Sequence, residues 1–182
     1  NLEKFLNVKI NYHSYNFDLL PNKFKEEAKR LLPKKDYIGL SITQGNLYRK
    51  KSWLLKNFIE LAREIIKKNK IPVFFIEKNN IALIEEIKSN IPKDLFPEIN
   101  SNISSPALVT ALADRLEKAI SIDNGVMHMM SLSRVPMVVL FGPTNSKKFA
   151  PLIKNIKILD SKSLYNNNEI NKITVEDVLK VI

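Results

Sequence analysis

The sequence predicts an α/β fold, with a Rossmann-like, mostly parallel sheet and helices on both of its faces. Two observations lead to this prediction. Short apolar runs of strand length alternate along the chain with longer amphipathic segments of helical period. The main apolar runs also end in polar turns. Because strands joined through helices need right-handed crossovers, this alternation favours a parallel sheet.

The chain divides into two expected segments. Residues 1–36 are expected to be an interdomain lead-in with a short helix over 24–32, and residues 37–182 to be one folded domain. A chain of 182 residues with 45% hydrophobic residues is long enough for one well-packed domain. It begins with Asn1 rather than Met, so we expect it to be part of a longer protein.

The first half of the domain contains the clearest helical pattern. Over 54–66, apolar residues recur at three- and four-residue spacings and give one apolar face. A strand is expected before this helix, at 37–42, and another after it, at 72–76. A second helix is expected over 81–91, followed by an irregular segment at 92–105 that contains two prolines.

The second half continues the alternation between two capped helices. Pro106 suits the first turn of a helix over 106–116, with Ser104 or Ser105 as its cap. Thr174, with Asp177 three residues later, indicates a capped helix that closes the chain. Between them we expect, in chain order, a strand at 119–122, a helix at 126–133, strands at 136–141 and 155–159, and a surface loop at 164–172.

The composition excludes several kinds of site. The chain has no cysteine and only two histidines, His13 and His128, so thiolate or multi-imidazole metal sites are not available. We expect no metal and no cofactor. No apolar run reaches membrane-span length. The net charge of +10 suits a phosphate-bearing ligand, or reflects lysines spread over most of the expected helix surfaces. Because arginine-rich blocks and aromatic-basic stripes are lacking, we expect no nucleic-acid partner.

The most informative motif is the polar turn after the strand at 119–122. Asp123, Asn124 and Gly125 form the turn, and His128 lies on the helix that follows. At the carboxyl edge of a parallel sheet, such a turn offers backbone amides to an anion. Because a carboxylate repels phosphate, we expect Asp123 to cap backbone amides or accept from a hydroxyl. His128 either contacts a phosphate or lies half-buried on the inner face of its helix.

A second polar segment follows the first strand. Ser41 and Thr43 can donate to phosphate oxygens, and Lys50 or Lys51 can approach them as a point charge at the start of the long helix. The alternative is a solvated basic loop. In either case Trp53 is expected to anchor the helix in the core.

Other strand ends carry polar residues as well. The strand at 136–141 ends in a Phe-Gly-Pro-Thr turn, in which the glycine allows a sharp turn and Thr144 offers its hydroxyl and amide to the same crevice. Glu77 and Asn80 follow the second strand, where the ribose of a nucleotide commonly meets a polar side chain. A solvated loop is an equal alternative for these two residues.

Taken in order, these motifs resemble a known family. They are a Lys-x-Trp at a helix start (51–53), Asp-x-Gly-x-x-His (123–128), Phe-Gly-Pro-Thr (141–144) and the closing helix segment (173–178). Together they resemble the C-terminal half of bacterial lipopolysaccharide heptosyltransferases, glycosyltransferase family nine, over residues 20–182.

The resemblance implies one half of a GT-B fold, whose C-terminal Rossmann-like domain binds a nucleotide-sugar donor, typically ADP-heptose. It implies an inverting glycosyltransferase that moves a heptose or related sugar to a lipopolysaccharide or other cell-surface glycan without a metal. The general base and the glycan or lipid-linked acceptor belong to the N-terminal domain of such enzymes. We therefore expect no catalytic residue in this chain, an inactive fragment, and a cytoplasmic protein peripherally associated with the inner membrane.

The resemblance also implies which residues bind the donor. The second position of the Asp-x-Gly motif is commonly Thr in the family but is Asn124 here, and the ribose-binding acidic residue falls at Asn80 or is replaced by Glu77. An alternative function is a non-catalytic nucleotide- or phosphate-binding module with the same fold. The candidate site residues are Ser41, Thr43, Lys51, Glu77, Asn80, Asp123, Asn124, Gly125, His128 and Thr144.

Overall fold

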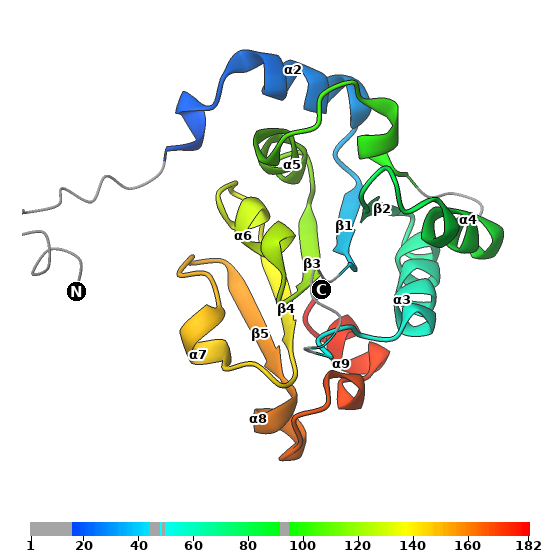
Figure 1. Cartoon of the computed structure of the whole chain (residues 1–182), viewed down its shortest axis with the longest axis vertical. Helices are drawn as coiled ribbons and strands as arrows, with labels where there is room; N and C mark the ends of the chain where they lie inside the picture. The colour runs from blue at the N-terminus through cyan, green and yellow to red at the C-terminus, as the bar shows by residue number, and fades with distance from the viewer. Residues whose placement is uncertain (1–15, 44–47, 49, 92–94) are drawn as a thin grey trace, which may run out of the picture.

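The sheet has five parallel strands in the order β2-β1-β3-β4-β5 (Figure 1). The computed structural model that shows this describes residues 16–43, 48, 50–91 and 95–182. The strands are β1 (Tyr37–Ser41), β2 (Ile71–Phe75), β3 (Lys118–Ile122), β4 (Met137–Phe141) and β5 (Ile156–Asp160). The predicted α/β fold with a parallel sheet is confirmed.

Helices cover both faces of the sheet (Figure 1). One face carries α3 (Leu55–Lys67), α4 (Ile81–Asn90) and α9 (Val175–Leu179). The opposite face carries α2 (Asn22–Leu31), α5 (Pro106–Ala113) and α6 (Gly125–Ser131). Within this second layer α2 packs on α5, and α5 packs on α6.

Alternation along each strand divides the core into two parts. In β4, Val138 and Leu140 belong to the cluster under α3, α4 and α9, whereas Met137, Val139 and Phe141 belong to the cluster under α5 and α6. All five of these side chains are buried. A central strand that is apolar on both faces needs helices on both sides, because either face left bare would expose its side chains to water.

Side-chain caps fix the helix ends as the sequence predicts. The Ser105 hydroxyl accepts from the Ala107 amide, 3.2 Å away, with Pro106 in the first turn. Thr174 and Asp177 form the predicted reciprocal capping box of α9. Trp53 is buried, and its indole N–H donates to the Ile173 carbonyl over 2.8 Å. The predicted anchoring role of Trp53 is therefore confirmed, and it connects the start of α3 to the segment before α9.

The short elements are not expected from the sequence. The 3-10 turns are η1 (Phe17–Leu19), η3 (Pro97–Asn100) and η4 (Ile170–Lys172), and the short helices are α7 (Ser146–Phe149) and α8 (Ser161–Tyr165). The loop expected at 164–172 is thus partly helical. Asp160 accepts from the amides of Lys162 and Ser163, which starts α8, and Asn166 in the left-handed region ends it.

Two glycines have different structural requirements, and this predicts different effects of the same substitution on stability. A Cβ on Gly142 would lie 2.7 Å from both the Cβ and the backbone nitrogen of Ile170, whereas a Cβ on Gly125 would have nothing within 4 Å. We expect Gly142→Ala to lower the free energy of unfolding by roughly 2–3 kcal/mol, because backbone must move to admit the methyl group. Gly125→Ala is the matched control and should keep wild-type stability in urea unfolding. Equal stability of the two variants would contradict this assignment.

Candidate functional site

The strand order places a topological switch point between β1 and β3. From β1 the chain runs outward to β2, and it then returns to β3 on the other side of β1. The segments that leave the carboxyl ends of β1 and β3 therefore diverge, and open α/β sheets bind ligands in the crevice at such a point. Thr43 follows β1, and the Asp123-Asn124-Gly125 turn follows β3.

Asn124 joins the two strand ends. Its Nδ2 donates to the Ser41 hydroxyl and to the Thr43 carbonyl oxygen, each over 2.8 Å. Its Oδ1 accepts from the Met127 amide over 2.8 Å and so caps α6. One side chain thus starts the helix after β3 and holds the chain that leaves β1.

These contacts change two of the expected roles. Asp123 is expected to cap backbone amides or accept from a hydroxyl, but the cap is Asn124, because its position is the one directly before the first helical residue. Ser41 is expected to face a phosphate. It is fully buried and its hydroxyl accepts from Asn124, so in this structure it belongs to the frame beneath the crevice.

Lys51 and Asp123 form an ion pair at the wall of the crevice. The distance from Lys51 Nζ to Asp123 Oδ2 is 2.5 Å, and the two side chains are only 13% and 7% exposed. Lys51 Nζ also lies 3.4 Å from the Asp123 carbonyl oxygen. Lys50, by contrast, is exposed. The buried Trp53 two residues later fixes the backbone that carries Lys51, and the crevice therefore contains a positioned ammonium group.

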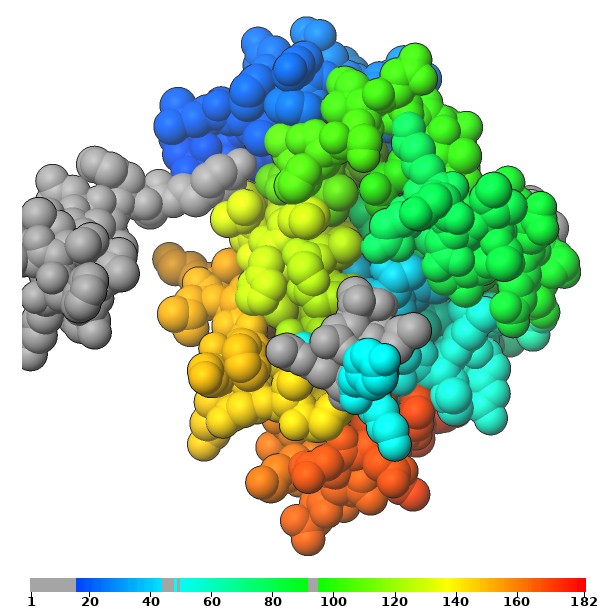
Figure 2. All heavy atoms as spheres, in the orientation of Figure 1, coloured from blue at the N-terminus to red at the C-terminus, as the bar shows by residue number. Residues whose placement is uncertain are grey.

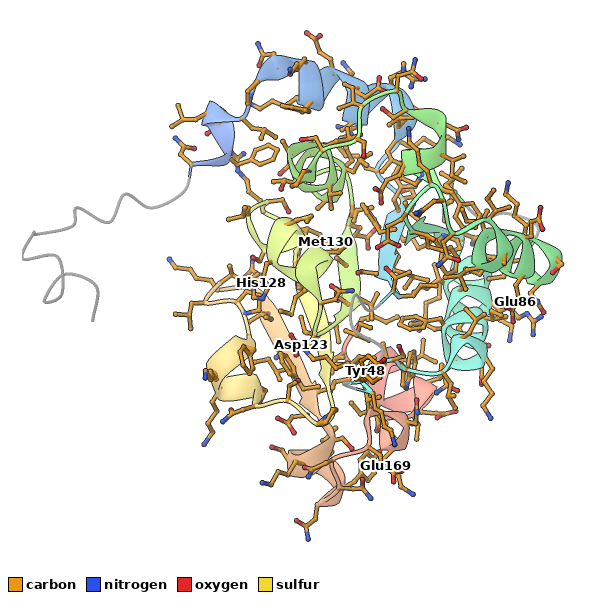
Figure 3. The ribbon with its side chains drawn as sticks, viewed as in Figure 1. Tyr48, Glu86, Asp123, His128, Met130 and Glu169 are labelled. Carbon is orange, nitrogen blue, oxygen red and sulfur yellow. The ribbon has the colours of Figure 1, made fainter. Side chains whose placement is uncertain are left out.

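The start of α6 leaves room in front of its backbone. Gly125 is exposed, and neither a positive φ angle nor a crowded neighbour requires a glycine there. His128 is also exposed, so the half-buried alternative is wrong for this histidine, while Met127 and Met130 are buried in the core. Figure 3 labels Asp123, His128 and Met130 along this segment. In Figure 2, α6 (yellow-green) lies on the face of the molecule that is turned toward the viewer.

The carboxyl end of β2 extends the site. Thr43 Oγ1 donates to Glu77 Oε1 over 3.3 Å, which connects the chain after β1 to the chain after β2. Asn80 lies at the start of α4 and makes no capping hydrogen bond. Together with Thr43, Trp53 and Leu83 it lines a hollow of about 330 Å³.

Thr144 is expected to face the same crevice as Asp123, and the structure places it in the lining of another hollow. Among the described residues, the buried Thr144 hydroxyl has no hydrogen-bond partner. The residue lines a second hollow, formed with α7 and α8. Gly142 also differs from expectation: its φ angle is not positive, and glycine is needed because the backbone of Ile170 approaches it closely.

Glu98 is a site residue that the sequence does not indicate. Burial first, and then the neighbouring carboxylate of Glu77, raise the pKa of Glu98 to about 7, against the opposing effect of the Lys78 ammonium. The two glutamates come together because Leu95 pairs with Val73 of β2. The turn after Leu95 therefore lies beside the turn after β2. No sequence spacing between residues 77 and 98 signals this.

The described part of the chain holds no group of three His, Cys, Asp or Glu side chains suited to a metal ion. Its helices are all too short or too polar to cross a membrane.

The role of Asn124 predicts a graded loss of stability. Asn124→Ala removes the cap and both donors to the chain leaving β1, so we expect a loss of about 2–3 kcal/mol in the free energy of unfolding. Asn124→Asp keeps the cap acceptor but removes both donors, and it should lose about half as much. Urea unfolding of the three proteins tests this order. Wild-type stability in Asn124→Asp would show that the cross-strand bonds contribute nothing.

Glu98 predicts a pH-dependent stability. Its folded pKa of about 7 lies above the ordinary 4.5, so the folded state holds the proton more tightly. This contribution is complete below pH 4.5 and is lost as the pH rises through about 7. When the pH is raised from mildly acidic to mildly alkaline, the free energy of unfolding of Glu98→Gln should therefore rise relative to that of wild type by on the order of 2 kcal/mol.

The control for this measurement is Glu86→Gln, which changes an exposed glutamate on α4 (Figure 3). Its stability difference from wild type should be flat across the same pH range. Parallel pH profiles for wild type and Glu98→Gln would rule out the raised pKa.

Two of three comparisons with known proteins find a match. The family model for glycosyltransferase family 9 (heptosyltransferase) matches residues 2–179. A search of curated proteins finds no significant match. Among solved structures, a family 9 glycosyl transferase from Veillonella parvula is 17% identical with a TM-score of 0.73, and the match covers 89% of this chain and 51% of that one.

Two Escherichia coli enzymes are also similar in structure. The ADP-heptose lipopolysaccharide heptosyltransferase II is 16% identical with a TM-score of 0.68, over 88% of this chain and 50% of its own. Heptosyltransferase WaaC, solved with ADP, is 14% identical with a TM-score of 0.68, over 84% of this chain and 47% of its own. The chain thus spans about half the length of these structures. Since the family model covers nearly the whole sequence, the chain belongs to glycosyltransferase family 9.

Proposed function

We propose that this chain is the donor-binding part of an inverting glycosyltransferase. Its donor would be a nucleotide sugar, ADP-heptose or a close relative, and its acceptor a lipopolysaccharide or other cell-surface glycan. The observation that carries the proposal is the pair of Lys51 and Asp123 beside the Asn124-Gly125 helix start, at the switch point of the sheet. Family membership, and the structure of the similar enzyme WaaC with ADP, support the choice of ligand.

The diphosphate is proposed to bind in front of Gly125. The first amides of a helix have no partner within the helix, and the open space at Gly125 lets an oxygen approach them. Lys51 supplies positive charge beside that position, and exposed His128 supplies a ring nitrogen. As the sugar leaves, negative charge develops on the diphosphate, and a positioned ammonium group stabilises it without reorganisation.

Asp123 is proposed to position the lysine rather than to bind phosphate. Its carboxylate holds the Lys51 ammonium at 2.5 Å, and both groups are largely excluded from water. A free lysine on a flexible chain would lose side-chain entropy when a phosphate arrived; a lysine already held loses less. The ion pair with Lys51 thereby offsets the repulsion expected between the Asp123 carboxylate and a diphosphate.

The nucleoside is proposed to extend toward the carboxyl end of β2. Glu77 there accepts from Thr43, and the half-buried Glu98 lies nearby. Carboxylates at this edge of a doubly wound sheet are suited to bind ribose hydroxyls. The acceptor site and the general base are proposed to lie in the half of the similar, longer enzymes that this chain does not span. Sugar transfer would require that half.

Binding of ADP to the chain tests this proposal. We expect titration calorimetry to show ADP binding, and Lys51→Ala to weaken it about tenfold or more, because a charge-assisted contact to phosphate is lost. His128→Ala, a change at an exposed residue that leaves the fold intact, should weaken it as well. Lys56→Ala removes an exposed charge from α3 and is the matched control. Unchanged affinity in both Lys51→Ala and His128→Ala would place the nucleotide elsewhere.

A further inference from the structure

The turn after β4 and the start of α8 enclose a hollow of about 460 Å³ at the carboxyl edge of β4 and β5. Its lining comes from the ends of these strands and from α7 and α8, which Figure 1 labels. The lining residues are all polar or small: Gly142, Pro143, Thr144, Asn145, Ser146, Lys147, Asp160, Lys162, Ser163 and Asn168. A hollow of this size admits a small ligand such as a monosaccharide.

The hollow has a surplus of hydrogen-bond donors. Lys147 and Lys162 make no ion pair with any described residue. Asn145 precedes α7 without capping it, so its amide is available to a ligand. A lysine ammonium group supplies only hydrogen-bond donors, and the side-chain amide of asparagine supplies two donors. The lining therefore offers several hydrogens to a ligand that brings oxygen atoms.

Its one carboxylate is already occupied. Asp160 accepts from the amides of Lys162 and Ser163 at 2.9 and 3.3 Å, and from the hydroxyl of Ser146. By accepting these three hydrogen bonds, the carboxylate connects α7 to α8. Two ammonium groups against one satisfied carboxylate leave the hollow with a net positive charge, which favours an anion.

Thr144 adds an independent observation that points to a ligand. Its hydroxyl is buried and, within the described part of the chain, has no hydrogen-bond partner. Buried hydroxyls without partners are uncommon, and each calls for an explanation such as a ligand or water. Because no hydrogen bond to a described residue holds it, the side chain can change its χ1 rotamer and offer the hydroxyl to a ligand in the hollow that it lines.

We infer that this hollow is an anion-binding subsite that accepts a phosphorylated sugar, with Lys147 and Lys162 on the phosphate and the hydroxyl and amide side chains on the sugar. It is separate from the Lys51–Asp123 crevice, because its lining comes from the β4 and β5 ends. The inference does not depend on where the nucleotide binds. A phosphate matches point charges from two lysines, and hydroxyls and amides both donate to and accept from sugar hydroxyls.

Titration of the ¹⁵N-labelled 182-residue chain with glucose 6-phosphate tests this inference. We expect saturable shifts of the amide signals of Asn145, Lys147, Lys162 and Ser163, also in the presence of saturating ADP. Glucose should give no shifts, and inorganic phosphate should bind several-fold more weakly than glucose 6-phosphate. Equal affinities for inorganic phosphate and glucose 6-phosphate would overturn the role of the sugar.

Variants test which residues hold the ligand. Lys147→Gln with Lys162→Gln should weaken binding of glucose 6-phosphate at least about tenfold. Thr144→Val should also weaken it while keeping wild-type stability, because no hydrogen bond is lost. Lys148→Gln is the matched control, since Lys148 lies over the Phe149 ring and outside the hollow. Absence of binding, wild-type affinity in the double variant, or displacement by ADP would each overturn the inference and leave the hollow to water.

Discussion

The candidate site depends on one set of hydrogen bonds, those that Asn124 makes across the switch point. Parallel strands on either side of such a point send their chains apart, so nothing in the sheet itself fixes the distance between the two departing segments. Asn124 fixes it with two bonds of 2.8 Å to Ser41 and Thr43, and a third that starts α6. Thr43 in turn donates to Glu77, so the ends of β1, β2 and β3 form one connected frame.

Within this frame, the charges of Asp123 and Lys51 depend on each other. An unpaired Asp123, only 6% exposed, would be costly to bury and would repel a diphosphate. Pairing with Lys51 removes both problems, and places an ammonium group where the lysine backbone alone would not hold it. The exposed groups, Gly125 and His128, are those with no structural requirement in the fold. This division between framing and exposed residues is the physical basis of the proposed donor site.

Sequence patterns predict the elements that periodicity and caps define, and they miss what tertiary contact defines. The helix over 54–66, the Ser105 and Thr174 caps and the burial of Trp53 all follow from local chemistry. Glu98 approaches Glu77 because Leu95 pairs with Val73 of β2, and Thr144 lines a hollow that α7 and α8 form with the end of β5. Neither contact is local, so no spacing in the sequence encodes it.

The asparagine at position 124, where the resemblance in sequence leads us to expect threonine, is best understood through these bonds. A threonine hydroxyl can accept from the amide of the third helical residue and cap α6 just as Asn124 does. It is too short, however, to donate at the same time to both Ser41 and Thr43 across the crevice. Compared with threonine, asparagine therefore lacks a hydroxyl near the proposed phosphate position, but it connects the ends of β1 and β3 by hydrogen bonds. Because Lys51, Gly125 and His128 keep their places, this exchange alters the frame of the site while leaving its charge unchanged.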